Sequence, residues 1–177
     1  MNPMRVSIPL LGTLLLAVVL AGCTHVRSSQ NVELSGEGTW LVLPLVNRTA
    51  TPQAGLRAAA IVESVLFRHG VNTVTRYPQS DNQGVLFEGT SAASRKKMDK
   101  WIRSQSADYV VSGVVHEWRY KTGVDGEPAV GVMIEIRELP EGRIVYSGTG
   151  SRAGWARQSL SEVGQKVIDK LISPVVQ

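Results

Sequence analysis

Asp125 and Glu127 are the close pair of carboxylates that the chain places in a glycine-rich segment, which runs from Lys121 to Pro128. Two carboxylates that face one sugar bond could supply the acid and the base, or the nucleophile, of a glycoside hydrolase. Those two groups normally come from separate rigid elements, because the reaction needs a fixed distance between them. Catalysis by this pair is therefore disfavoured. The plain interpretation is a solvated turn, since Gly and Asp are common turn residues.

Other residue types that could do chemistry are present without the partners they need. The chain has three histidines, His25, His69 and His116. They lack a second ligand at a spacing typical of zinc sites. Three glycines lie close together in the sequence, Gly148, Gly150 and Gly154. Their spacing is wrong for a phosphate-binding loop, and no serine stands in a G-x-S-x-G motif. We expect no catalytic residues, no metal site and no cofactor, so the protein is not expected to be an enzyme.

Cys23 is the one cysteine of the chain and directly follows Leu20-Ala21-Gly22. Before it, a short charged start ending at Arg5 leads into an apolar run from Ile8 to Leu20, which is typical of a signal peptide. That run is too short for a membrane-spanning helix, which needs about 20 residues. The small pair before the cysteine resembles a bacterial lipobox, in which the thiol is acylated. We expect residues 1–22 to be removed and Cys23 to carry the lipid.

The residue after Cys23 is Thr24, where an inner-membrane retention signal would resemble Asp. The outer membrane is therefore the expected destination. Residues 24–38 are polar, rich in serine and without a regular period, so residues 23–38 are predicted to form a lipid-anchored flexible tether. The remaining segment, 39–177, has a length usual for a single domain.

Trp155 follows Gly154 and has Arg152 and Arg157 close by in the sequence. Tryptophan beside arginine is typical of a membrane interface, where the indole lies among the lipid headgroups and the cations near phosphate. A Trp packed at the edge of the domain is an equally good interpretation from the sequence alone, because Trp is often largely buried.

The elements that must position these residues centre on residues 108–150, which read as three consecutive strands. In the middle strand Val130, Val132, Ile134 and Ile136 share one face, the period of two expected for a half-buried strand. In the first strand Val110, Val114, Trp118 and Tyr120 share a face by the same count, and we expect this strand to leave the sheet near His116. The turn Leu139 to Gly142 predicts a hairpin into the third strand.

The rest of the chain supplies helices and two further strands. Trp40 to Val46 and Val71 to Thr75 read as strands, although Pro44 favours an edge or a bulge in the first. Ala58 to Leu66 repeats at helical spacing, Ser91 to Ser104 reads as a weaker helix, and Ser159 with Glu162 forms a capping box at the start of a third helix. We predict a single α/β (α+β) domain, in the order β-α-β-α-β-β-β-α, with a mixed sheet and helices packed on its faces.

The net charge is +4, and it falls to +3 once Arg5 is removed with the signal peptide. The basic residues that cluster all lie on the predicted second helix, at Arg95, Lys96, Lys97, Lys100 and Arg103. A nucleic-acid binder usually concentrates basic charge into a stripe on the folded surface. We interpret this cluster as a solvated helix face and expect no nucleic-acid partner.

Four runs of this chain form a pattern: Glu117-Trp118-Arg119-Tyr120-Lys121, then Gly123 to Val130, and later Ser147-Gly148 and Gly154-Trp155. This pattern resembles the PelC family, the outer-membrane lipoproteins of bacterial Pel exopolysaccharide export systems. The match covers most of the chain after the signal peptide and is closest from 117 to 171. The resemblance implies an α/β domain like those of curli-secretion and TolB-type periplasmic proteins, assembled into a dodecameric ring at the periplasmic face of the outer membrane.

The resemblance also implies a function. Each subunit of the ring would display Asp125 and Glu127 to a cationic, Pel-like exopolysaccharide and guide it to an outer-membrane β-barrel porin. The shared Gly-Trp pair favours contact of Trp155, Arg152 and Arg157 with outer-membrane lipid. The alternative is a tethered regulator that docks on a periplasmic cell-wall synthase and activates it. Such a regulator would need a long linker, whereas about 15 residues here would reach at most roughly 50 Å.

Overall fold

The computed structural model describes residues 24–28, 32–78, 92–123, 126–155 and 157–176. The strands are β1 (Thr24–Ser28), β2 (Thr39–Val42), β3 (Val46–Asn47), β4 (Thr73–Arg76), β5 (Tyr109–Tyr120), β6 (Pro128–Glu138) and β7 (Arg143–Ala153). The helices are α2 (Ala54–Arg68), α3 (Ala92–Ser104) and α4 (Leu160–Ile172). No helix within these residues has the length and apolar character needed to cross a membrane.

All described strands belong to one mixed sheet, in the order β1-β7-β6-β5-β2-β4, with β3 paired to β5. The three long strands pair antiparallel as a meander, and β1 adds an antiparallel strand beside β7. On the other side, β2 lies parallel to both β4 and β5. The predicted fold class is therefore confirmed, and the meander from 108 to 150 forms its centre.

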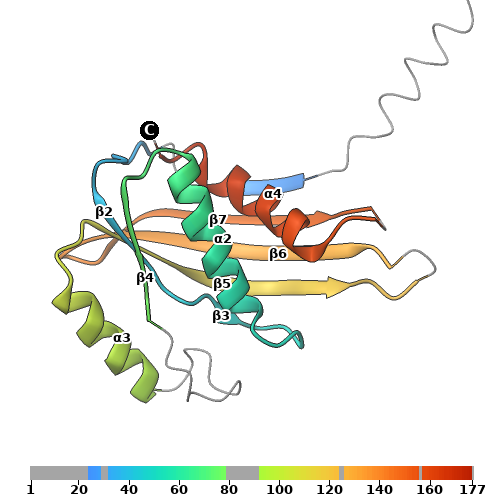
Figure 1. Ribbon diagram of the computed structural model, residues 1–177, viewed down its shortest axis with the longest axis horizontal. Coiled ribbons are helices and arrows are strands. Elements are labelled where there is room, and N and C mark those ends of the chain that lie inside the picture. Colours follow the sequence, from blue (N-terminus) through green and yellow to red (C-terminus); the bar gives the residue numbers. More distant parts are fainter. Residues whose placement is uncertain (1–23, 29–31, 79–91, 124–125, 156, 177) are drawn as a thin grey trace, which may run out of the picture.

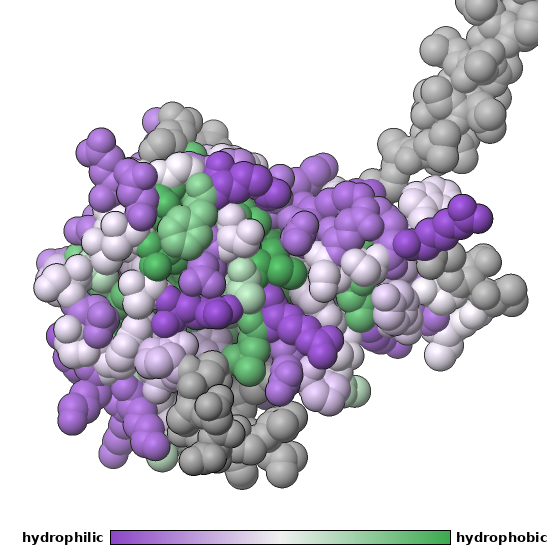
Figure 2. Space-filling view, in the orientation of Figure 1, coloured by the Kyte–Doolittle hydropathy of each residue, from purple (hydrophilic) through white to green (hydrophobic). Residues whose placement is uncertain are grey.

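Helices α2 and α4 cover one face of this sheet and contact each other (Figure 1). Beneath them the four predicted core residues of β6, from Val130 to Ile136 in alternation, are fully buried. The serine half of the predicted capping box is present, since the Glu162 backbone N–H donates to Ser159 Oγ at 3.1 Å. The Glu162 carboxylate accepts from Gln158 and Lys166. Figure 2 shows that the outside of this helical layer is mostly hydrophilic, with some hydrophobic side chains along α2. Phe67 of this helix is half-exposed.

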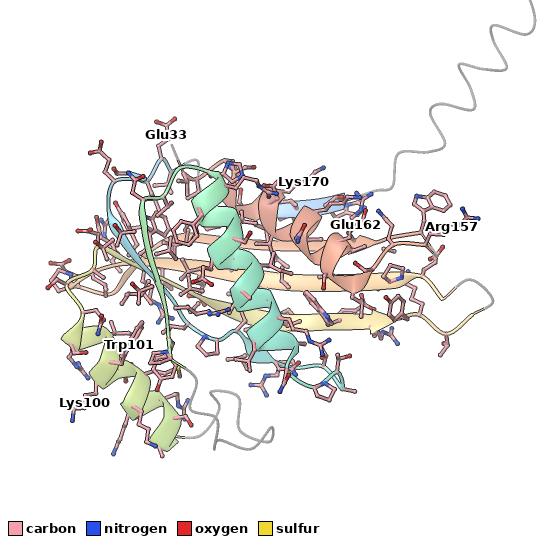
Figure 3. The ribbon with its side chains drawn as sticks, viewed as in Figure 1. Glu33, Lys100, Trp101, Arg157, Glu162 and Lys170 are labelled. Atoms are coloured by element: carbon pink, nitrogen blue, oxygen red, sulfur yellow. The ribbon has the colours of Figure 1, made fainter. Side chains whose placement is uncertain are left out.

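Helix α3 packs near one end of the sheet, away from α2 and α4 (Figure 1). Half-buried Trp101 and Ile102 of this helix pack on a small second core cluster of Leu41, Leu43 and Val110. The basic residues of α3 are all exposed, and Lys100 is visible on the helix beside Trp101 (Figure 3). Their exposure is that of a solvated helix face, although Arg103 also lines a hollow between α3 and the sheet.

Three expectations need correction. The predicted strand from Trp40 to Val46 is divided into β2 and β3 around Pro44, a residue whose backbone has no N–H to donate to a strand ladder.

Strand β5 does not leave the sheet near His116. It continues to Tyr120 with a register shift between Val115 and Glu117. Because a bulge of one residue changes the face on which later side chains lie, Trp118 joins the core beneath the helices.

The third correction concerns the predicted tether. Residues Thr24–Ser28 form β1, whose register with β7 pairs Thr24 with Arg152 and Ser28 with Gly148. Leu34 is buried, and its backbone N–H donates to the Val175 carbonyl at 2.7 Å. The prediction of a flexible tether is therefore wrong for 24–28 and 32–38. Backbone pairing can stabilise a strand of polar sequence, because it depends little on the side chains that face water.

Gly164 allows α4 to lie directly on the sheet. A Cβ atom at this position would come within 2.6 Å of Trp118 Cη2 and 3.3 Å of Ile61 Cδ1. Replacing Gly164 by leucine should therefore lower the free energy of unfolding by about 3 kcal/mol, because overpacking forces the helix off the sheet. Denaturant unfolding measures this loss. The matched substitution Gln165→Leu, at an exposed position of the same helix, should change the unfolding midpoint little. An unchanged midpoint for Gly164→Leu would contradict this packing.

Candidate membrane and polymer face

The residues singled out in the sequence lie at one end of the sheet, which we call the loop end. Here β5 ends at Tyr120 opposite Pro128 of β6, and Ala129 pairs with Ala153 at the end of β7. Strand β1 begins at the same end, because Thr24 pairs with Arg152. In Figure 1 these strand ends lie together on the right of the molecule, opposite the end that carries α3. Segments far apart in the sequence thus meet on one small surface.

The loop between β5 and β6 forms one part of this end. Its two sides are joined where the Lys121 backbone N–H donates to the Glu127 carbonyl at 2.7 Å. Gly126 has a φ of 52°, which a glycine adopts without strain. Lys121 is exposed and Glu127 is half-buried, while the side chain of Tyr120 is 51% exposed beside them. Asp125 lies outside the described residues, so its predicted role remains a prediction.

The corner between β7 and α4 forms the second part. Gly154 is buried there, and its backbone N–H donates to the Pro128 carbonyl at 2.7 Å. Trp155 follows with 54% of its surface exposed, so it is not a core residue. Arg157 is exposed at the same corner, near the first turn of α4 that carries Glu162 (Figure 3). Hydrogen bonds from Lys166 and from Gln158 hold the pKa of the Glu162 carboxyl below its usual value.

The third part is the start of β1. Cys23 lies outside the described residues, but Thr24, the next residue along the chain, is fixed in the sheet. The Arg152 guanidinium donates to the Thr24 hydroxyl, and the Arg152 side chain is half-buried. Arg152 is thus tied to β1, whereas Arg157 is open to solvent. Thr24, the residue directly after the predicted acylation site in the sequence, is the described residue that lies at this corner.

A hollow of about 420 Å³ lies along the last part of β5 and is lined by Thr49, Thr51, His116, Glu117 and Arg119, among other residues. Its two charged groups pair with each other, since Arg119 Nε lies 3.0 Å from Glu117 Oε1. It therefore presents one carboxylate, already paired, where glycoside hydrolysis normally uses two. Among the described residues no group of three or more His, Cys, Asp and Glu could hold a metal ion.

Two features of the loop end, strand β1 and the contacts of Gln158, were not predicted from the sequence. Strand β1 has no alternation of apolar residues that would mark it. Gln158, which bonds to the backbone of Trp155, gives no signal in the sequence except its place three residues after Trp155 and four before Glu162. Neither position stands out by residue type, because glutamine is common on protein surfaces.

No protein-family model matches this sequence, and the curated proteins contain no match either. Among solved structures, a PelC dodecamer from Paraburkholderia phytofirmans matches with a TM-score of 0.72 and 38% sequence identity. The match covers 86% of this chain and 98% of that chain. A variant of the PelC dodecamer from the same organism, with one leucine replaced by methionine, matches with a TM-score of 0.71, 38% identity and 97% of its own length covered.

Proposed function

Because this chain belongs to the PelC family, we propose that it is a non-enzymatic outer-membrane lipoprotein of an exopolysaccharide export system. Its subunits form a ring at the periplasmic face of the outer membrane and guide the polymer to a porin. The observation that carries this proposal is the meeting, at the loop end of the sheet, of the start of β1, exposed Trp155 and the loop that ends at Glu127. Membrane attachment and polymer contact then belong to one end of each subunit.

The ring follows from the relatives, whose solved structures are dodecamers. In a closed ring every surface is repeated once per subunit, so the loop from Lys121 to Glu127 would recur around the opening. Repeated carboxylates from Asp125 and Glu127 would concentrate a cationic polymer there by focusing the field. The positive charges of Arg152 and Arg157 are at the other corner of the loop end, beyond β6, where they would meet anionic lipid headgroups.

Membrane contact combines the lipid on Cys23 with the β7–α4 corner. Strand β1 begins one residue after the proposed acylation site and pairs with β7 directly before Trp155. The lipid would therefore enter the bilayer beside the indole and the exposed guanidinium of Arg157. An indole among headgroups and cations near phosphate are favourable at a membrane interface.

The second candidate is the regulator of a cell-wall synthase. It needs a linker that lets the domain leave its own membrane, and the pairing of β1 with β7 removes most of the linker that the sequence predicts. The described part of 24–38 is packed on the domain rather than free to extend. This observation favours a domain held at the outer membrane, as the ring requires.

Trp155→Ala should reduce export about threefold to tenfold, because each subunit of the ring would lose one interfacial indole. The free energy of unfolding should change by no more than about 0.5 kcal/mol, as is usual for exposed positions. Exopolysaccharide secretion and thermal unfolding measure the two effects. Phe67→Ala is the matched control, since Phe67 is an equally exposed aromatic residue on α2. Wild-type export from Trp155→Ala would contradict membrane contact by this residue.

A further inference from the structure

Trp155 is exposed, but the turn that carries it is fixed by one residue. The Trp155 backbone N–H donates to the side-chain oxygen Oε1 of Gln158 at 3.1 Å. In the opposite direction, the Gln158 backbone N–H donates to the Trp155 carbonyl at 2.9 Å. Gln158 thus closes the turn with its side chain and with its backbone. Both polar groups of the Trp155 backbone are held while its indole stays in solvent.

The side chain of Gln158 is itself anchored to α4. Its Nε2 donates to Glu162 Oε1 at 2.6 Å, and Lys166 Nζ lies 2.7 Å from the same oxygen. Glu162 in turn is in the capped first turn of the helix. An amide is suited to this place because it has an acceptor for Trp155 and a donor for Glu162. The turn is therefore linked by hydrogen bonds to a rigid helix.

Packing leaves Gln158 little freedom. A Cβ atom on Gly154 would come within 2.7 Å of Gln158 Oε1 and 2.6 Å of Val163 Cγ2, so the amide lies directly against the buried glycine. A turn that is fixed on its inner side and carries an exposed indole on its outer side is arranged for contact with something outside the domain. Ordering such a group before binding removes part of the entropic cost of binding.

We infer that Gln158 is a positioning residue that holds Trp155 ready for insertion into the surface of a phospholipid bilayer. The inference rests on the membrane contact proposed above and adds the residue that prepares it. The bilayer fits better than a protein groove because Arg157 is exposed at the same corner and Thr24, the residue after the proposed lipid attachment, pairs with Arg152 there. Anionic headgroups complement that guanidinium, and the interface accommodates the indole.

The test uses the mature chain from residue 23 with Cys23→Ser, so that binding reports the domain and not the acyl chains. Vesicles of phosphatidylethanolamine and phosphatidylglycerol, with brominated lipid as quencher, measure affinity and insertion together. Quenching that remains in Trp155→Ala comes from Trp40, Trp101 and Trp118 and is subtracted. Four variants are compared: Trp155→Ala, Gln158→Ala, Gln158→Glu, and Gln158→Glu combined with Glu162→Gln.

Trp155→Ala should lower vesicle affinity by about tenfold, and Gln158→Ala by about threefold, because the turn must then be ordered on binding. Gln158→Glu keeps the acceptor for the Trp155 N–H but sets a carboxylate against Glu162. It should therefore weaken vesicle binding about as much as Gln158→Ala does. Adding Glu162→Gln exchanges the amide and the carboxylate between positions 158 and 162. The introduced amide can donate to the introduced carboxylate and still suits the capping box, so affinity and quenching should return close to the starting values.

The melting temperature of each variant separates positioning from general stability, since a merely structural role would not be restored by the exchange. Wild-type affinity and quenching in Gln158→Ala, beside weak binding in Trp155→Ala, would overturn the role of Gln158 and leave the membrane contact standing. If the variant that combines Gln158→Glu with Glu162→Gln binds no better than Gln158→Glu alone, the positioning role of Gln158 is also overturned. Wild-type binding by Trp155→Ala would overturn the membrane contact itself, and the role of Gln158 with it.

Discussion

Asp125→Lys is expected to reduce exopolysaccharide export about tenfold or more while the protein stays folded, abundant and at the outer membrane. Each copy of the substitution changes the charge by two units, and a ring repeats this change in every subunit. A cationic polymer would then meet a repelling field instead of an attracting one. Focused fields of this kind raise local concentration and association rates by about 10-fold to 1,000-fold, so their reversal has a large effect.

Two further variants at the same loop make the result specific. Asp125→Asn removes the charge without reversing it and should give intermediate export. Lys121→Glu changes an exposed residue of the same loop by the same two units in the opposite direction, and export should stay near wild type if Lys121 faces away from the opening. Secretion is measured beside an immunoblot for protein level. Wild-type export from Asp125→Lys at normal abundance would mean that the carboxylate only serves the turn, and guidance by charge would have to be abandoned.

Cys23→Ser is expected to move nearly all of the protein from the outer-membrane fraction to the soluble periplasm. Acyl chains contribute about 0.8 kcal/mol for each CH₂ group that enters the bilayer, far more than one interfacial indole supplies. The domain should remain folded, because β1 is held by its pairing with β7 and not by the lipid. Fractionation of cells, with Ser28→Ala as the control in the same strand, measures the change. Retention of Cys23→Ser in the outer membrane would refute the lipid anchor.

The meander and two helices could be predicted because their burial follows their sequence period. Alternation in β6 correctly identified the buried residues from Val130 to Ile136, and helical spacing correctly identified the buried face of α2. The Ser159 and Glu162 cap was also visible, since a capping box is a local motif. In each case the physical cause lies within a few neighbouring residues.

The faces of β5 could not be predicted beyond His116. Counting by two places Val114 and Trp118 on one face, but the register shift between Val115 and Glu117 breaks the count. A bulge depends on the partner strand, here β6, and leaves no reliable mark in the bulged strand. Strand β1 was not predicted, for a related reason. Its pairing with β7 satisfies backbone groups across more than 120 residues of sequence, and its side chains carry no period.

The candidate site was predicted residue by residue but not as an arrangement. Trp155 and Glu127 were each singled out from local composition, and nothing in the sequence placed them at one end of the sheet. The antiparallel register of β5, β6 and β7 does so, because it returns the chain to the same end after each hairpin. Gln158 was missed because its role consists of hydrogen bonds to Trp155 and Glu162, which only the folded turn brings within reach.

The ring is the central claim, and the mass of the folded domain in solution tests it most directly. Size-exclusion chromatography with light scattering on the chain that begins at Thr24 requires no lipid and no export partner. We expect a closed assembly near twelve times the subunit mass, as in the dodecameric relatives. A stable monomer at high concentration would contradict the ring and would favour the regulator of a cell-wall synthase instead.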